Sequence, residues 1–229
     1  MGRQEGYEAC DSFIGRRQTG VMDIAVNLVE TYLRLNGYLT MSEFEIQRRG
    51  ENGLYETVTD VDIVGFRLPG DIYAADDHED CRMLQISDPA LELRPDMIDV
   101  ILGEVKQGDA QFNPSITRHE VLHSVLQRLE WAYSVPIIGV VEALQEHGLS
   151  EVPACAGTGV VRTRMVAFGR SPTTDLYTIS LSHIFSTMLG YFHDLEEVLR
   201  PAQFKDPAPA LLKLLVKTGF EITRPDESK

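Results

Sequence analysis

The feature that most constrains this chain is the stretch MIDVILGEVKQG, residues 97–108, near the middle of the sequence. Its apolar side chains form a nearly continuous run instead of alternating with polar ones. A strand with that pattern is buried on both faces of a sheet, so the stretch predicts a central β-strand. Glu104 and Lys106 stand at its end, where ionised side chains are costly unless they are paired or bind a metal.

The other periodic segments give the chain a succession of helices and strands. Helices are expected at residues 21–38, 113–133, 179–199 and 209–220, and strands at residues 42–49, 56–70, 97–108, 135–141 and 159–170. This order predicts an α/β fold, with a central mixed sheet flanked by helices. Within it we expect an N-terminal arm at residues 1–20, a core at residues 21–170 with an acidic insertion at residues 71–96, and a C-terminal helical extension at residues 171–229 packed on the core.

The acidic balance of the chain limits its partners. The 229 residues carry a formal net charge of −14, so the surface as a whole does not attract a polyanion. A nucleic-acid function therefore requires a local basic patch, a metal ion or a partner. Basic side chains on expected strands can either line a phosphate-binding groove or simply face solvent, and these are Arg48, Arg49, Arg162, Arg164 and Arg170.

Two absences bear on the cellular location. No apolar stretch is long enough to span a bilayer, and the N-terminus lacks the apolar segment of a secretory signal. The three cysteines, Cys10, Cys81 and Cys155, are far apart and odd in number, which favours a reducing compartment. We therefore expect a cytoplasmic protein without a membrane partner.

Acidic and basic residues recur on two of the expected strands. Residues two apart on a strand share a face, so Glu104 and Lys106 project together, as do Asp60 and Asp62. If the strands are neighbours, Asp62, Glu104 and Lys106 converge on one point. Mg²⁺ takes one or two carboxylates there, and a lysine beside it orients or deprotonates a water. The alternatives are a surface ion pair between Glu104 and Lys106 and a solvated Asp60.

The order of these residues resembles that of the PD-(D/E)xK nuclease superfamily, which includes restriction endonucleases and Holliday-junction resolvases. The family pattern is a helix with a glutamate, a strand with an aspartate, a strand with (D/E)-x-K and a further helix. Here NLVETYLRLNGY offers Glu30, TDVDIVGF offers Asp62, and GEVKQG offers Glu104 and Lys106. The resemblance covers roughly residues 23–170.

The resemblance implies a restriction-endonuclease-like core and hydrolysis of a phosphodiester, in DNA or else RNA, that depends on Mg²⁺ or Mn²⁺. It implies that Asp62, Glu104 and the Val105 carbonyl bind the metal. It also implies that Lys106 positions the attacking water and that Glu30 holds a second metal or a metal-bound water. Glu30 can instead pair with Arg34 at i,i+4.

Gln107 is either a phosphate contact or an ordinary strand end. The family's proline is replaced by Val61, and the acidic insertion is long. An inactive member that serves in binding or assembly is therefore an alternative function, and a homodimer is left open.

A second metal hypothesis comes from HEVLH. His119 and His123, four apart on a helix, can bind Zn²⁺, with Glu120 as general base and Glu142 or His147 as third ligand. Against a zinc hydrolase, Glu142 follows a strand-like run, and no glycine follows His123. The alternative is a half-exposed helix that packs on the sheet.

Overall fold

The structure is a computed structural model that describes residues 23–51, 53–70, 87–155, 159–170, 177–196 and 204–220. The expected arm at residues 1–20 lies outside the described residues. The expected insertion at residues 71–96 is described only from residue 87.

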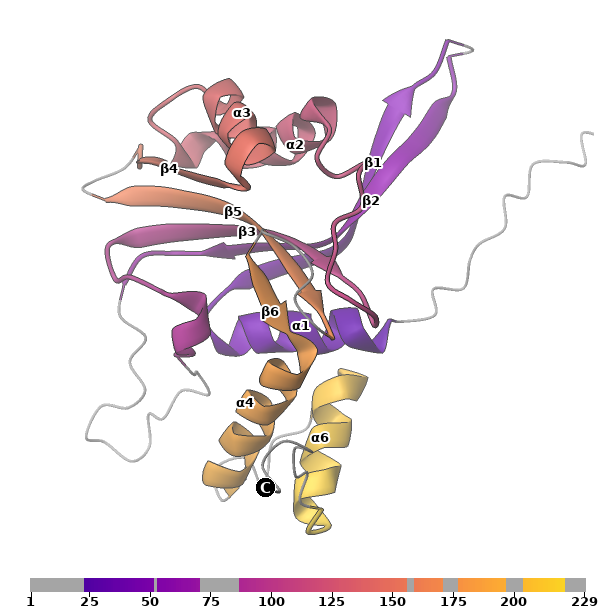
Figure 1. Ribbon diagram of the computed structural model, residues 1–229, viewed down its shortest axis with the longest axis vertical. Coiled ribbons are helices and arrows are strands. Elements are labelled where there is room, and N and C mark those ends of the chain that lie inside the picture. The colour runs from indigo at the N-terminus through magenta and orange to yellow at the C-terminus, as the bar shows by residue number, and fades with distance from the viewer. Residues whose placement is uncertain are drawn as a thin grey trace, which may run out of the picture.

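The described part of the chain is an α/β fold with a six-stranded mixed sheet, as the sequence predicts (Figure 1). Three strands form an antiparallel meander, namely β1 (Leu39–Arg49), β2 (Tyr55–Arg67) and β3 (Met97–Val105). Next to β3 lies β5 (Val160–Gly169), which runs parallel to it. β5 also pairs with β4 (Leu149–Pro153), which is antiparallel, and with β6 (Thr178–Ser180), which is parallel.

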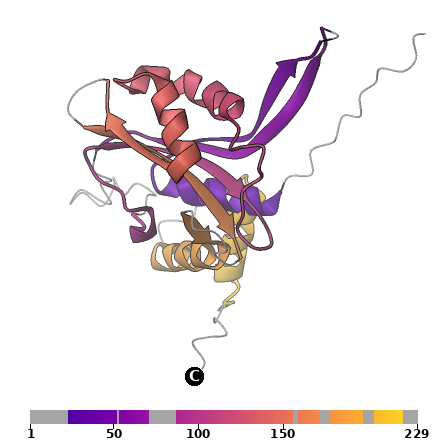
Figure 2. The ribbon, with the colours of Figure 1, turned by 45° about the horizontal axis from the view of Figure 1, so that its top comes forward.

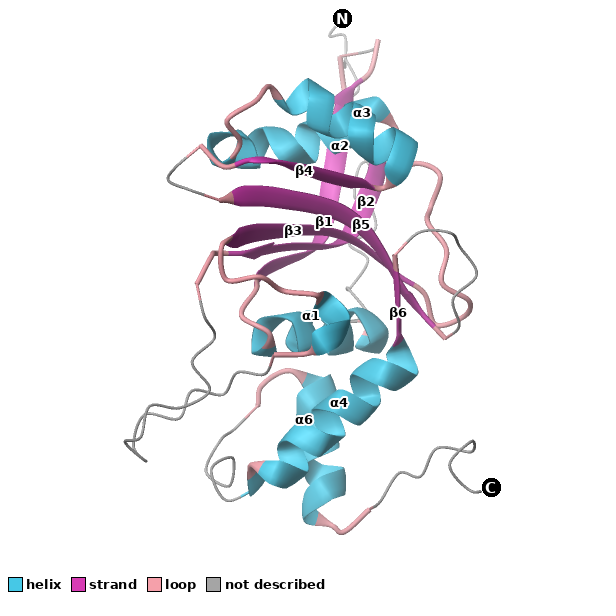
Figure 3. Cartoon of the chain, turned by 60° about the vertical axis from the view of Figure 1, so that its left-hand side comes forward, coloured by secondary structure: helices cyan, strands magenta, loops and turns pink. Residues whose placement is uncertain are grey.

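Helices cover both faces of the sheet (Figure 3). One face packs against α1 (Ile24–Leu35), and α4 (Leu181–Asp194) and α6 (Pro207–Lys217) lie beyond α1. The other face packs against α2 (His119–Leu126) and α3 (Ile137–His147). Two 3₁₀ helices, Pro89–Leu91 and Gln127–Ala132, complete the described helices. Among the described residues, no helix is long and apolar enough to cross a membrane.

The distal part of β1 and β2 extends beyond the sheet as a two-stranded arm (Figures 1 and 2). The arm begins where Phe44 pairs with Val61 and ends at the turn between Arg49 and Tyr55. Its register shifts between Ile46 and Gln47. Because most side chains of its outer half are exposed, this part of the hairpin adds surface and little core.

β3 is the centre of the fold, because all nine of its residues are buried. Ile101 and Val105 point into the apolar cluster beneath α1, while Val100 and Leu102 point into the cluster beneath α2 and α3. The continuous apolar run in the sequence follows from this double burial.

Asp99 is fully buried on β3 and receives bonds from two arginines of β5. Its carboxylate accepts from Arg162 Nε at 2.6 Å and from Arg164 Nη2 at 2.8 Å, and it also accepts from the Tyr38 hydroxyl. Arg162 and Arg164 are only 6 % and 2 % exposed. The interpretation of these two arginines as solvent-facing strand residues is therefore wrong, because both side chains are buried beside Asp99.

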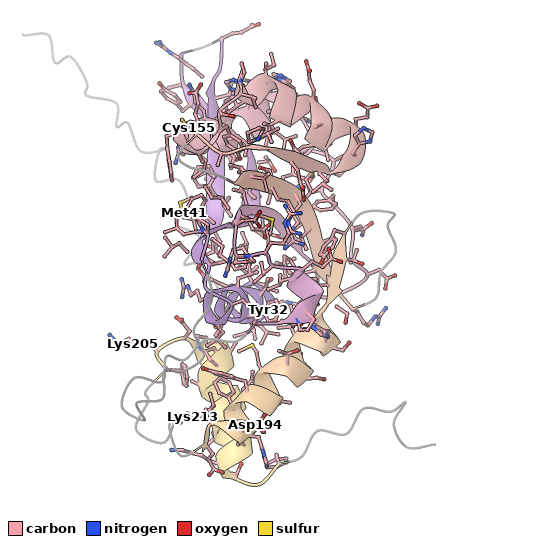
Figure 4. All side chains as sticks on the ribbon, turned by 90° about the vertical axis from the view of Figure 1, so that its left-hand side faces the viewer. Tyr32, Met41, Cys155, Asp194, Lys205 and Lys213 are labelled. Atoms are coloured by element: carbon pink, nitrogen blue, oxygen red, sulfur yellow. The ribbon has the colours of Figure 1, made fainter. Side chains whose placement is uncertain are left out.

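The C-terminal helices are tied to the core through Asp88. Its carboxylate accepts from Tyr32 at 2.8 Å and lies 2.7 Å from His183 Nε2 on α4. Burial alone raises the pKa of Asp88, but the Ala90 N–H, Tyr32 and His183 outweigh it and lower that pKa. Figure 4 labels Tyr32 where α1 meets this helical layer. Residues 181–194 and 207–217 are therefore packed against α1, as a helical extension on the core.

Three expectations about secondary structure require correction. The strand expected at residues 135–141 is instead the start of α3, which begins after Pro136 and buries side chains at helical spacing, including Val140, Val141 and Leu144. The helix expected at 113–133 begins only at His119 and continues as a 3₁₀ helix. The short strands β4 and β6 were not expected, because each depends on pairing with β5.

We predict that Asp99→Ala lowers the free energy of unfolding by about 3–5 kcal/mol, because it leaves two buried guanidinium groups without their carboxylate. Urea unfolding followed by circular dichroism measures this change. The matched control is Asp109→Ala, which breaks an exposed pair with Arg170 and is expected to change the free energy by less than about 1 kcal/mol. Equal effects of the two substitutions would contradict the prediction.

Candidate metal site at the end of β3

Asp62, Glu104 and Lys106 come together at the point where β2 passes the C-terminal end of β3. Ile63 pairs with Gly103, so continuation of this antiparallel register puts Asp62 opposite Glu104. Gly103 permits close packing here, since a Cβ at this position would lie 3.0 Å from the Phe168 ring. The convergence that the sequence predicts from neighbouring strands is present.

Asp62 is fixed by the backbone of β3. Its Oδ2 accepts the Val105 N–H at 2.7 Å, so the carboxylate is held against the last residue of the strand. Burial raises the pKa of Asp62; the Val105 N–H and the Lys106 charge lower it, and the charges of Asp60 and Asp23 raise it, with a net rise. The carboxylate is thus held in a desolvated place that already carries negative charge.

Glu104 and Lys106 form an ion pair that is buried at one end only. The Lys106 ammonium lies 2.5 Å from Glu104 Oε1; the Glu104 side chain is 3 % exposed and that of Lys106 is 38 % exposed. The Lys106 backbone N–H donates to the Phe168 carbonyl at 2.8 Å, which anchors the residue to β5. This geometry differs from the surface ion pair considered as an alternative, because the acid is in the core.

The second oxygen of Glu104 is the most informative atom of the site. Oε2 is buried and has no hydrogen-bond partner among the residues that the structure describes. Burial raises the pKa of Glu104; the bond from Lys106 lowers it, Asp62 raises it, and the net direction is upward. An unpaired buried carboxylate oxygen beside a second carboxylate is the environment that a divalent cation stabilises.

Asp23 and Asp60 add to the negative potential, and Asp23 was not among the residues expected here. Asp23 is the N-cap of α1, where its Oδ1 accepts the Ala25 N–H at 2.7 Å. Asp60 is exposed on β2. An aspartate directly before a helical apolar pattern is an N-cap signal, so the sequence offered a means of placing Asp23 at the helix start.

Glu30 is not brought together with the other acids by any contact of its carboxylate. It lies on α1, where its Oε1 accepts from Arg34 at 2.6 Å and from Thr40 at 3.1 Å. α1 covers one face of the sheet, while alternation along β3 puts Glu104 on the face of Val100 and Leu102. The i,i+4 pair with Arg34, which the sequence left open as an alternative, is the arrangement found.

The expected nucleic-acid contacts are distributed over the surface. Arg48 and Arg49 lie exposed on the arm, where Arg48 is 3.9 Å from Glu120 and Arg49 Nε is 3.4 Å from the Gly53 carbonyl. Gln107 is exposed beside the site and donates to Asp23 Oδ1 at 3.5 Å. The arginines are thus available to solvent, although on a different element from the acids.

The histidines of HEVLH lie one turn apart on α2, with His119 as its first residue and His123 in its last turn. The rings of His119 and His123 stack with their centroids 5.9 Å apart. Within the described ranges, no group of three or more His, Cys, Asp or Glu side chains is arranged to hold a metal ion. Neither Glu142 nor His147 therefore completes the histidine pair, and the acids at the end of β3 offer two carboxylates, those of Asp62 and Glu104, without a third among the described residues. Glu142 lies on α3, a helix where the sequence predicted a strand.

Comparisons with known proteins give no relative for this chain: no family model, no curated protein and no solved structure matches it. The function of the chain must therefore be inferred from the geometry of the site itself.

We predict that Asp62→Asn raises the free energy of unfolding at pH 7.5 without added metal. The raised pKa means that the folded state holds the Asp62 proton more tightly than the unfolded state. The protonated Asp62 carboxyl group contributes fully to the free energy of unfolding below its ordinary pKa of 3.8. This contribution is lost as the pH rises through the raised pKa. The neutral amide does not suffer that loss and keeps an oxygen for the Val105 N–H.

Urea unfolding at pH 7.5 and at acid pH tests this expectation. The gain should shrink toward zero as the pH falls to the ordinary pKa. Asp194→Asn is the control, since the Asp194 side chain is 81 % exposed at the end of α4 (Figure 4). A loss of stability at pH 7.5 in Asp62→Asn alone would show that the carboxylate is structural.

Proposed function

We propose that the chain is a nuclease of the PD-(D/E)xK class, with a restriction-endonuclease-like core, that hydrolyses nucleic-acid phosphodiesters with Mg²⁺ or Mn²⁺. The observation that carries the proposal is the buried, unpartnered Oε2 of Glu104, described above, beside Asp62 and Lys106. DNA is the substrate we expect, with RNA as the alternative polymer.

The arrangement of elements supports the proposal independently of the site. α1 precedes a three-stranded meander, Asp62 lies on its second strand, Glu104 ends its third, and helices lead from there to the parallel strand β5. This is the order that the family pattern requires. Val61 in place of the family's proline does not disturb the register, because Val61 pairs with Phe44 inside β1 and β2.

The residues present fit a divalent cation. Asp62 and Glu104 offer two carboxylates, and the Val105 carbonyl is the expected third ligand; Mg²⁺ needs only one or two carboxylates and retains several waters. Burial is the largest cause of the raised pKa values of both carboxyl groups; neighbouring carboxylates add to the rise, and Lys106 opposes it. A bound cation would stabilise the ionised form of both groups. When bound, the cation supplies Lewis-acid stabilisation of charge on the phosphate oxygens.

The charges around Lys106 support one role for this residue in the proposed reaction. Burial lowers the pKa of its ammonium, but the bond to Glu104 and the charges of Glu104, Asp62 and Asp60 outweigh burial and raise it. Without a bound metal ion, Lys106 is therefore protonated at neutral pH. We infer that it orients the attacking water and offsets phosphate charge.

The acidic chain must approach nucleic acid through local contacts. Arg48 and Arg49 on the arm are the exposed cations we assign to the phosphate backbone, and Gln107 is an exposed polar group that donates to Asp23 beside the site. Phosphate contacts of this kind position a substrate without reading its sequence.

We predict that the protein nicks supercoiled plasmid DNA in Mg²⁺ or Mn²⁺ and loses this activity in EDTA. Lys106→Met should lower the rate by about 10²-fold or more, as expected when a group that stabilises transition-state charge is removed. Gel analysis of plasmid, with labelled single-stranded DNA and RNA in parallel, measures the rates. Lys217→Met is the matched control, an exposed lysine at the end of α6 that should retain full activity.

Three outcomes would contradict the nuclease. Activity that survives in Lys106→Met, Asp62→Asn and Glu104→Gln belongs to a contaminant. If zinc sustains the activity and the His119→Ala variant loses it, hydrolysis takes place at the histidine pair on α2. Metal binding without cleavage of any polymer identifies an inactive binding module.

We also predict that Mg²⁺ stabilises the folded protein through this site. A cation at ten times its Kd should raise the free energy of unfolding by about 1.4 kcal/mol. Thermal unfolding with and without MgCl₂, at matched ionic strength, measures the effect. The same addition of MgCl₂ should leave the stability of the Glu104→Gln variant unchanged. An equal increase in both proteins would mean that the Glu104 carboxylate does not bind the cation.

A further inference from the structure

A second polar site lies at the opposite end of β3 and β5. A cavity of about 250 Å³ is lined there by Arg162 and Arg164 of β5, the segment 147–149, Glu151, Glu92 and Tyr177. Arg162 is opposite Asp99 in the parallel register, whereas Glu104 is opposite Ala167. The cavity is therefore separate from the candidate metal site, and the proposed function does not use it.

The charges behind this cavity do not balance. Arg162 and Arg164 share one buried carboxylate, that of Asp99. Burial and the Asp99 charge raise the pKa of Tyr38 far above its ordinary range, so this third partner of Asp99 is a neutral hydroxyl. Two guanidinium groups against one carboxylate leave one buried positive charge that Asp99 does not offset.

The unsatisfied donors belong to Arg164. All three nitrogens of Arg162 are bonded, to Asp99 and to the carbonyls of Leu91 and Glu92. Arg164 uses only Nη2, which donates to Asp99 at 2.8 Å and to the Leu91 carbonyl at 3.0 Å. Its Nε and Nη1 are buried and have no partner in the part of the chain that the structure describes.

The Arg164 side chain is held rigidly in this position. It is only 2 % exposed, and its guanidinium carbon lies 4.6 Å from the centroid of the Tyr177 ring. A buried donor without an acceptor costs about 1–3 kcal/mol, and more when it is charged, so such groups are normally satisfied by a ligand or by water. Arg164 also lines the cavity. A preorganised guanidinium group with unsatisfied N–H groups is a usual means of binding an oxyanion.

We propose that this cavity binds a small molecule through a carboxylate group, which accepts hydrogen bonds from Arg164. The cavity is slightly smaller than the usual range for ligand sites, which fits only a compact ligand. Glu92 and Glu151 also line it, and Glu151 is 3.3 Å from Arg94. Their negative charge disfavours a phosphate dianion and leaves a singly charged carboxylate as the better ligand.

Titration with sodium acetate, followed by ¹H–¹⁵N NMR spectra of the full chain, tests the proposal. We expect saturable shifts at the amides of Gly148, Leu149 and Glu151 that sodium chloride at equal ionic strength does not produce. Inorganic phosphate at pH 7.5 should bind more weakly than acetate.

Two variants locate the binding. Arg164→Met should lower the affinity for acetate by about tenfold or more. The substitution retains the one-to-one pair of Arg162 with Asp99. Glu151→Gln changes an exposed residue at the rim of the cavity. It should raise the affinity for acetate by about threefold, because a repelling charge is lost. Because Glu151→Gln leaves the buried network intact, it decides the question if Arg164→Met does not fold.

The opposite results are equally clear. Identical shifts with acetate and chloride would mean that water alone satisfies Arg164 and would overturn the proposal. Tighter binding of phosphate than of acetate would overturn the ligand class. A Glu151→Gln variant with unchanged affinity would place the acetate elsewhere.

Discussion

The complete burial of β3 is the constraint on which the rest of the structure depends. A strand covered on both faces must place every side chain in an apolar layer or give it a partner. Seven of its nine residues are apolar or glycine, and the two exceptions are Asp99 and Glu104. The two ionisable side chains of this strand therefore lie toward its opposite ends.

The two ends of β3 carry an excess of buried charge of opposite sign. Around Asp99, two arginines share one carboxylate. One of them, Arg164, lines a cavity and has two nitrogens without a partner among the described residues. Around Glu104, one lysine serves two carboxylates, and an acidic oxygen is left without a partner among the described residues. Each imbalance is costly in a desolvated site, and each is reduced by a ligand of the missing sign. A divalent cation at one end and a carboxylate at the other are expected for the same physical reason.

How much the sequence could predict depended on whether a feature was local. The helix at α1 and the strands around Asp62 and Glu104 were predictable, because their periodicity is set by neighbours in the chain. The segment at residues 135–141 was misread, since a short apolar run fits a buried strand and a buried helix equally well. Pro136, which precedes the helical residues of α3, was the local signal that favours the helix. Arg162 and Arg164 could not be placed, because their partner Asp99 lies 63 and 65 residues away.

The sequence by itself determined the α/β class and the doubly buried β3, because alternation and continuous apolar runs record burial directly. It predicted the set Asp62, Glu104 and Lys106 from strand spacing together with the resemblance to the nuclease superfamily. Only the tertiary structure decided which ionised groups have partners. It paired Glu30 with Arg34, enclosed two arginines around Asp99 and left Glu104 Oε2 unbonded within the described part of the chain. Hydrogen bonding between distant segments depends on which strands are neighbours in the sheet, and the spacing of residues along the chain does not give the strand order.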